Sequence, residues 1–291
     1  MLYINSRLFK IQLIAQVALI LLIFLISFSV SIQAVFAGIL LCVVGIPHGA
    51  NDHLYRKDQS SKGMLKFLGV YLGIIAAYAI LWYLLPLVAL ILFFGISFHH
   101  FGQSNFENEE VAYLPSILWG LLLLAFPVII HFQEAINIFK SMLDFGNFTQ
   151  TATEFNLFDL RNWQIVSLLI LVLVYNLSLY IYQRKYFLKY FLQLLMVSLW
   201  YFFTPLLFGF VIVFCLWHAM QSTQYQLNFY TQSLKKSKFN FFVAMLPFSL
   251  IALLGFGIFV YFFTFNVSQA FILLSLITLP HVLVMHKLYQ T

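Results

Sequence analysis

Long apolar runs separated by short polar segments make up most of this chain. An apolar helix needs about 20 residues to cross the hydrocarbon core of a bilayer, so the pattern predicts ten spans. They lie near 9–31, 34–54, 65–85, 87–103, 114–132, 163–183, 186–203, 206–226, 240–263 and 268–288. We find no internal repeat and no linker, so the sequence predicts an all-α integral membrane protein with its helices in a single bundle, one polytopic domain over 1–291.

Composition excludes a water-soluble globular domain. The chain is 63% hydrophobic and 8% charged, whereas soluble domains carry about 25% charged residues. The net charge of +6 is explained by membrane topology, and we do not expect nucleic acid as a partner.

The distribution of basic residues predicts the orientation. With the N-terminus in the cytoplasm, only Lys140 and Arg161 of the 15 Lys and Arg residues fall on the outer side, which agrees with the positive-inside rule. Both termini are therefore predicted to be cytoplasmic, in a multi-pass protein of the inner (cytoplasmic) membrane. The outer loop 133–162 has Ile136, Phe139 and Leu143 at helical spacing, which predicts a short helix on the outer membrane surface.

Histidines concentrate in the cytoplasmic halves of spans 2, 4, 8 and 10. These seven are His48, His53, His99, His100, His218, His281 and His286; only His131 lies near the outer side. Ionisable groups inside a membrane are costly and usually mark function, and converging neutral imidazoles are typical metal ligands. Nitrogen donors suit iron, copper, zinc or nickel, so the donor set does not select the metal.

Spacing assigns different roles to neighbouring residues. Asp52 follows His48 by four residues, on one helix face, where its carboxylate would orient a ligating imidazole as an outer partner. His53 points about 140° away from His48, so we place it outside the ligand set, next to Asp52. His99 and His100 point about 100° apart, and only one should face the centre.

A single histidine also has a structural explanation. Its side chain can hydrogen-bond to a neighbouring helix, or it can snorkel to the membrane–water interface. That alternative stays open for His53, His99 and His286, and it is favoured for His131. Gly49 and Gly102 each follow a histidine directly, where a small residue allows close helix approach.

Four segments, "GIPHGANDH", "FHHFGQSNF", "FCLWH" and "LPHVLVMH", resemble the histidine motifs of the Brp/Blh family of membrane β-carotene 15,15′-dioxygenases. The resemblance implies Fe(II)-dependent cleavage of β-carotene by dioxygen at the central double bond, giving two retinal molecules that pass to a microbial rhodopsin. It also implies His48, His100 and His218 as catalytic metal ligands.

The resemblance has one departure. Some family members have a histidine four residues after the one matching His218, where this chain has Ser222. Either His281 completes the site, or the site has three histidines, or it is impaired. We favour His281, because its helix and depth fit, and we place Ser222 beside the ligands. Phe101 and Trp217, adjacent to two of the histidines, are the expected substrate contacts.

Other classes of protein compete with this interpretation. A membrane di-iron oxidase would use HxxxH and HxxHH spacings, and neither occurs. A haem-binding cytochrome would pair histidines of two helices, as His48 and His218 could. A non-catalytic membrane protein remains an alternative if Ser222 disables the site.

Overall fold

A computed structural model describes residues 6–25, 29–56, 58–106, 109–144, 161–262 and 266–289. Every element within these ranges is helical, and ten helices there are long and apolar enough to cross a membrane. The prediction of an all-helical chain with ten candidate spans is confirmed.

Most spans are single helices, while the second and eighth are composite. The elements in chain order are α1 (Ser6–Leu25), α2 (Val30–Leu40), the π-helix η1 (Leu41–Gly45), α3 (Ile46–Gly49), the 3-10 helix η2 (Asp52–Tyr55), α4 (Ser61–Leu84), α5 (Pro86–Gln103), α6 (Glu109–Ile130), α7 (Phe132–Leu143), α8 (Arg161–Tyr182), the 3-10 helix η4 (Arg184–Tyr186), α9 (Phe187–Phe203), α10 (Leu206–Val213), the π-helix η5 (Phe214–Ala219), α11 (Met220–Gln232), α12 (Lys238–Phe262) and α13 (Val267–Tyr289).

The second span departs from the sequence prediction at its end. The α-helix stops at Gly49, and a separate 3-10 turn begins at Asp52, because Asn and Asp favour turns and caps over helix interiors. The next helix begins earlier than expected, at Ser61, because the Ser60 hydroxyl accepts a hydrogen bond from the Gly63 N–H at 3.0 Å and caps it.

The chain divides into two compact units. The first comprises Met1–His48, Phe98–Phe132 and Asp159–Phe241, and the second comprises Gly49–Ser97, Gln133–Phe158 and Phe242–Thr291. The single domain expected from the sequence stays a prediction.

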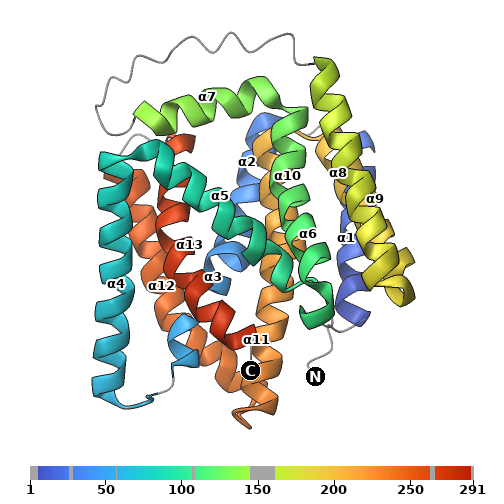
Figure 1. Ribbon diagram of the computed structural model, residues 1–291. Coiled ribbons are helices and arrows are strands. Elements are labelled where there is room, and N and C mark those ends of the chain that lie inside the picture. Colours follow the sequence, from blue (N-terminus) through green and yellow to red (C-terminus); the bar gives the residue numbers. More distant parts are fainter. Residues whose placement is uncertain are drawn as a thin grey trace. The chain divides into compact units, whose positions relative to one another are not determined.

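In the first unit, α6 packs against α8, and α1 runs alongside α9 (Figure 1). The fully buried rings of Trp119 and Tyr175 join α6 to α8, with 5.7 Å between their centroids. The end of α5 approaches α6 closely, because a Cβ atom built on Gly102 would lie only 1.8 Å from the Ser116 carbonyl oxygen. The close helix approach predicted at Gly102 is confirmed.

In the second unit, α4 lies against α13 (Figure 1). The buried Trp82 donates its indole N–H to Ser275 Oγ at 2.8 Å, and Trp82, Met142 and Ile272 share one apolar cluster. The predicted surface helix exists as α7, but Phe139 and Leu143 pack against this cluster. Part of its apolar face therefore contacts protein.

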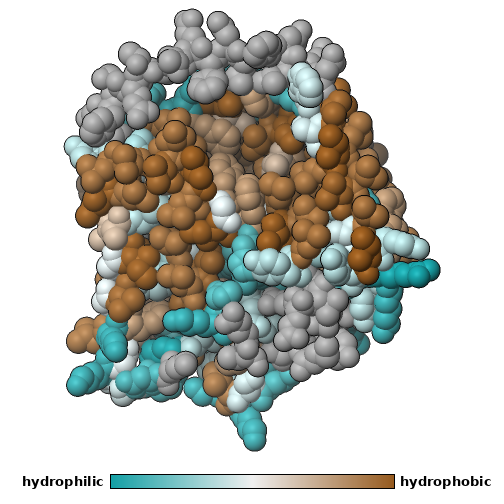
Figure 2. Space-filling view, viewed as in Figure 1, coloured by the Kyte–Doolittle hydropathy of each residue, from teal (hydrophilic) through white to brown (hydrophobic). Residues whose placement is uncertain are grey.

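Many large apolar side chains remain on the outside of these helices. On the face shown in Figure 2, hydrophobic side chains run along α8, where Trp163 and Leu173 are 70% and 68% exposed. Extended apolar surface of this kind is unfavourable in water. Together with the ten apolar helices, it supports a multi-pass membrane protein.

Gly102→Ala is expected to destabilise the fold, because the new methyl group would overlap the Ser116 carbonyl. Overpacking of this kind costs about 1–3 kcal/mol or more. Thermal unfolding in detergent measures the effect, with Gly95→Ala on the same helix as the control, because no atom lies within 4 Å of a Cβ there. Equal melting temperatures for the two variants would contradict the prediction.

Candidate metal centre

Two of the candidate histidines lie in or just after π-helical turns. The turn η1 precedes α3 and His48, and η5 contains His218. Pro47 explains the first turn, because proline has no N–H and its ring clashes with the carbonyl four residues earlier. In this turn the Ile46 N–H bonds the Leu41 carbonyl, five residues back. Such π-turns frequently occur at functional sites.

The two π-turns lie against each other, and Gly45 allows this approach. A Cβ atom on Gly45 would lie 3.2 Å from the Phe214 ring and 3.3 Å from Cys215 Sγ, tighter than ordinary contact. The packing brings the His48 and Phe214 rings to 5.4 Å, centroid to centroid.

Three buried imidazoles gather in the first unit. The His48 and His218 ring centroids are 5.3 Å apart, and those of His100 and His218 are 4.8 Å apart. Imidazoles on one ion, with metal–nitrogen bonds of about 2.1 Å, would place their centroids roughly 4.5–5.5 Å apart. Among the described residues no three His, Cys, Asp or Glu side chains form an arrangement that could hold a metal as they stand. Binding one ion would therefore require the three rings to turn.

The donor chemistry of this cluster also fits a metal. His48 Nδ1 contacts the Gly45 carbonyl oxygen, and only an N–H can donate to that carbonyl. The proton is therefore on Nδ1, and Nε2 keeps the lone pair that binds a metal. Imidazole nitrogens suit iron among other transition metals.

Aromatic rings surround His218. The Phe101 ring lies 4.3 Å from it and the Phe214 ring 5.5 Å from it, centroid to centroid. Phe101 was expected from the sequence as a neighbour of His100. Phe214 was missed, although its place four residues before His218 was an available signal. These rings give the cluster apolar walls.

A buried glutamine ties the His48 backbone to α11. Gln226 Nε2 donates to the His48 carbonyl at 3.0 Å and to Ser222 Oγ at 3.3 Å. Ser222 is fully buried and lies beside the backbone that carries a candidate ligand. Sequence reasoning missed Gln226, whose signal was a polar residue one helical turn after Ser222.

In the second unit, His281 belongs to a network with Asp52 and Tyr71. His281 Nδ1 lies 2.8 Å from Asp52 Oδ1, and the Tyr71 hydroxyl donates to Asp52 Oδ2 at 2.9 Å. The sequence placed Asp52 beside His48, whereas the structure shows it past the end of α3 with its carboxylate on His281. A role toward His48 stays a prediction. A carboxylate on Nδ1 favours the proton on that nitrogen and the lone pair on Nε2.

The other histidines have different surroundings. The His99 ring lies 5.7 Å from Tyr113, and the ring of the adjacent His100 lies 4.8 Å from His218. His53 stacks on Phe248 at 4.1 Å, and His131 Nε2 lies 3.0 Å from the Tyr201 carbonyl. His286 is exposed.

Trp217 was predicted as a substrate contact, and that role stays a prediction. Its fully buried indole N–H donates to Gln16 Oε1 on α1 at 2.5 Å, and its ring lies 5.6 Å from Phe9. The structure therefore shows Trp217 as an anchor between η5 and α1.

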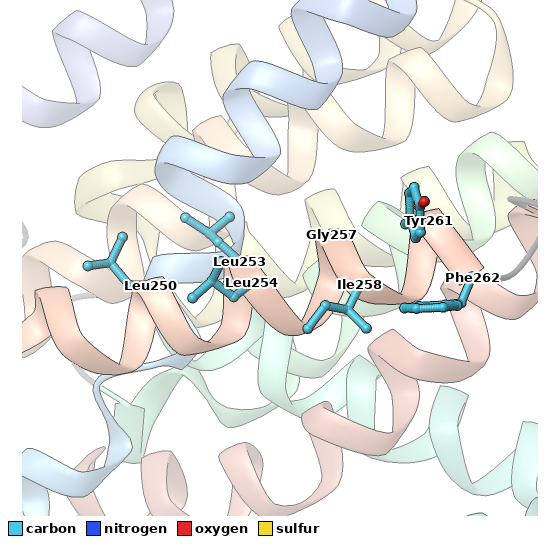
Figure 3. A pocket seen from close by; sticks show the side chains of 7 residues that line it. All are labelled: Leu250, Leu253, Leu254, Gly257, Ile258, Tyr261 and Phe262. Atoms are coloured by element: carbon cyan, nitrogen blue, oxygen red, sulfur yellow. The ribbon is translucent and has the colours of Figure 1, made fainter.

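A shallow surface depression occurs in the second unit, along α12 (Figure 3). One helix provides all of its lining: Leu250, Leu253, Leu254, Gly257, Ile258, Tyr261 and Phe262. None of these side chains is a nitrogen or carboxylate ligand, so the depression is not a metal site.

Comparisons with known proteins identify the family of this chain. The family model described as "Beta-carotene 15,15'-dioxygenase" matches residues 39–289. A relative from uncultured marine bacterium 66A03, named beta-carotene 15,15'-dioxygenase, is 34% identical over 73 residues, which are 23% of this chain and 26% of that protein. The matched part thus spans about a quarter of the relative's length. No solved structure matches. The family match covers all of the candidate ligands, and the chain belongs to the beta-carotene 15,15'-dioxygenase family.

Proposed function

We propose that this protein cleaves β-carotene at the central 15,15′ double bond. The observation that carries the proposal is the cluster of three buried imidazoles, with ring centroids 5.3 and 4.8 Å apart, within the family match. One dioxygen molecule is consumed, the carbon–carbon double bond breaks, and each carbon takes one oxygen atom, giving two molecules of retinal. We propose that the retinal passes to a microbial rhodopsin.

The proposed cofactor is Fe(II), held by His48, His100 and His218. Iron bound there would supply the activation of dioxygen, which organic side chains alone do not provide. The contact between His48 Nδ1 and the Gly45 carbonyl would hold this ring with Nε2 toward the ion. We propose His281 as a fourth ligand from its depth in the last span, supported by the bond from its Nδ1 to Asp52.

The apolar surroundings of the cluster suit the substrate. β-Carotene is a hydrocarbon that resides in the bilayer, so an enzyme with apolar walls and lipid-facing helices can receive it without passage through water. Phe101 and Phe214 are buried beside His218, where they would contact the polyene and exclude water from the reacting carbons.

A haem-binding cytochrome is the main rival, and the ring geometry disfavours it. Two axial imidazoles on opposite sides of one iron would place their centroids roughly 6–6.5 Å apart, for bonds of about 2.1 Å. The His48 and His218 rings are nearly perpendicular at 5.3 Å, and His100 lies 4.8 Å from His218. Three converging imidazoles are better suited to a mononuclear ion than to a planar porphyrin.

Expression in cells that accumulate β-carotene tests the function. We expect loss of the orange colour and appearance of retinal, identified by chromatography. Unchanged carotene in cells that contain folded, iron-loaded protein would refute the proposal.

The proposed orientation places both termini in the cytoplasm and the protein in the inner membrane. This follows from the basic residues, of which only Lys140 and Arg161 fall outside. Cysteine labels at the two ends and in the 233–237 connection should react only from the cytoplasm, and labels in the 145–160 loop only from outside. Opposite accessibility of the two termini would require an odd number of spans and would contradict this topology.

A further inference from the structure

Two fully buried glutamines lie on one face of α1. Gln12 and Gln16 are four residues apart, so they occupy neighbouring turns of the same face. Both are inaccessible. A buried primary amide inside a membrane protein is costly unless its hydrogen bonds are made, so the partners of these amides show what the pair stabilises.

Their partners are in the first unit, on η5 and α9. Gln12 Nε2 donates to the Leu216 carbonyl at 2.5 Å, and the Trp217 indole N–H donates to Gln16 Oε1, also at 2.5 Å. Gln16 Nε2 donates to the Met196 carbonyl of α9 at 3.1 Å. The pair thus contacts the two residues that directly precede His218.

The π-turn explains why the Leu216 carbonyl takes a side-chain donor. In a regular α-helix this carbonyl would accept the N–H of Met220, four residues later. In η5 the Met220 N–H instead bonds the Cys215 carbonyl, five residues back. The π-turn releases the Leu216 carbonyl from its α-helical donor, and Gln12 supplies a replacement.

A change from π to α geometry would alter the direction of His218. The π-turn bonds residues five apart and the α-helix bonds residues four apart, so the change shifts the hydrogen-bond register by one residue and reorients the side chains of the turn, His218 among them. With η5 in its present form the His218 ring stands 4.8 Å from His100 and 5.3 Å from His48. Gln12 bonds the backbone of this turn, and Gln16 bonds the Trp217 side chain that the turn carries.

We propose that α1 is a positioning element for the metal centre, in which Gln12 and Gln16 hold η5 in its π-turn and thereby aim His218. This inference rests on the proposed function, because it assumes that the three histidines bind a metal. The helix α1 lies before residue 39, where the family match begins. The proposed role therefore belongs to a part of the chain outside the matched region.

The test measures metal geometry in the purified full-length protein. Gln12→Met and Gln16→Met replace each amide with an apolar side chain of similar length, and Co(II) serves as the probe because its ligand-field absorption reports coordination geometry. We expect both variants to shift the Co(II) spectrum and to weaken Fe(II) binding about 10-fold, as loss of an outer partner does. Having two variants keeps the test open if one of them does not fold.

Gln193→Met is the matched control. Gln193 is also fully buried, and it exchanges hydrogen bonds with Asn105 at 2.7 and 3.2 Å, making none with η5. We expect this control to lower the melting temperature while the Co(II) spectrum stays that of the wild type.

The outcomes separate the two proposals. Wild-type binding with an unchanged spectrum in both folded α1 variants would overturn the positioning role and leave the metal centre in place. The same spectral shift in the Gln193 control would also overturn it, because the effect would then be general loosening. A wild-type protein that binds neither Co(II) nor Fe(II) would overturn the metal centre and this inference with it.

Discussion

Replacing His48, His100 or His218 with alanine is expected to reduce retinal formation to background and to remove most of the bound iron. Each ring is one member of the buried cluster with centroids 4.8 and 5.3 Å apart, so each substitution would delete a nitrogen ligand. Loss of an outer-shell partner alone costs about 10- to 100-fold in metal affinity, and loss of a ligand should cost more. Retinal yield in carotene-producing cells and iron content of purified protein measure the two effects.

Two other histidines provide matched controls. His99 is adjacent to His100 on α5, but its ring faces Tyr113, and His131 bonds the Tyr201 carbonyl. His99→Ala and His131→Ala should keep both iron and activity. A variant of His48, His100 or His218 that retains near wild-type activity would remove that residue from the proposed site.

The span pattern could be predicted because lipid imposes it. A crossing helix needs apolar length, and charge must stay near its ends, so ten spans are visible in the sequence. The packing of α7 was not visible, because an amphipathic face has the same pattern whether it meets lipid or protein. Phe139 and Leu143 meet the cluster around Trp82, a contact far apart in the sequence.

The sequence predicted which histidines gather at the candidate site, but it predicted less well which side chains hydrogen-bond to them. Histidine in an apolar helix is a strong signal, and His48, His100 and His218 do gather. Their side-chain partners were predicted from regular α-helical spacing, and the chain departs from it: Asp52 lies past the end of α3 and bonds to His281. Hydropathy did not reveal either π-turn, because an extra residue in one turn leaves the apolar run unchanged.

The remaining question of the site is its fourth ligand. If His281 completes the coordination, His281→Ala should lower both bound iron and retinal yield. Asp52→Asn should then weaken iron binding by about 10-fold, because an amide is a poorer acceptor for the His281 Nδ1 proton. Tyr71→Phe should have the smallest effect, because it removes only a donor to the far oxygen of Asp52. An active, iron-replete His281→Ala protein would refute this choice of ligand.

Ser222→His discriminates between four and three histidine ligands. If His281 is a ligand, the coordination position is already filled and the added imidazole has no place on the iron. The substitution also removes the hydroxyl that Gln226 contacts at 3.3 Å. The same glutamine holds the His48 carbonyl at 3.0 Å, so we expect no gain in iron affinity and a modest loss of activity. With only three ligands, the new histidine, one turn after His218, should tighten iron binding instead. Iron titration of Ser222→His and His281→Ala, alone and combined, decides the question. If the combined variant recovers iron, the histidines at positions 222 and 281 can substitute for one another. If it still loses iron, a histidine at position 222 cannot reach the metal.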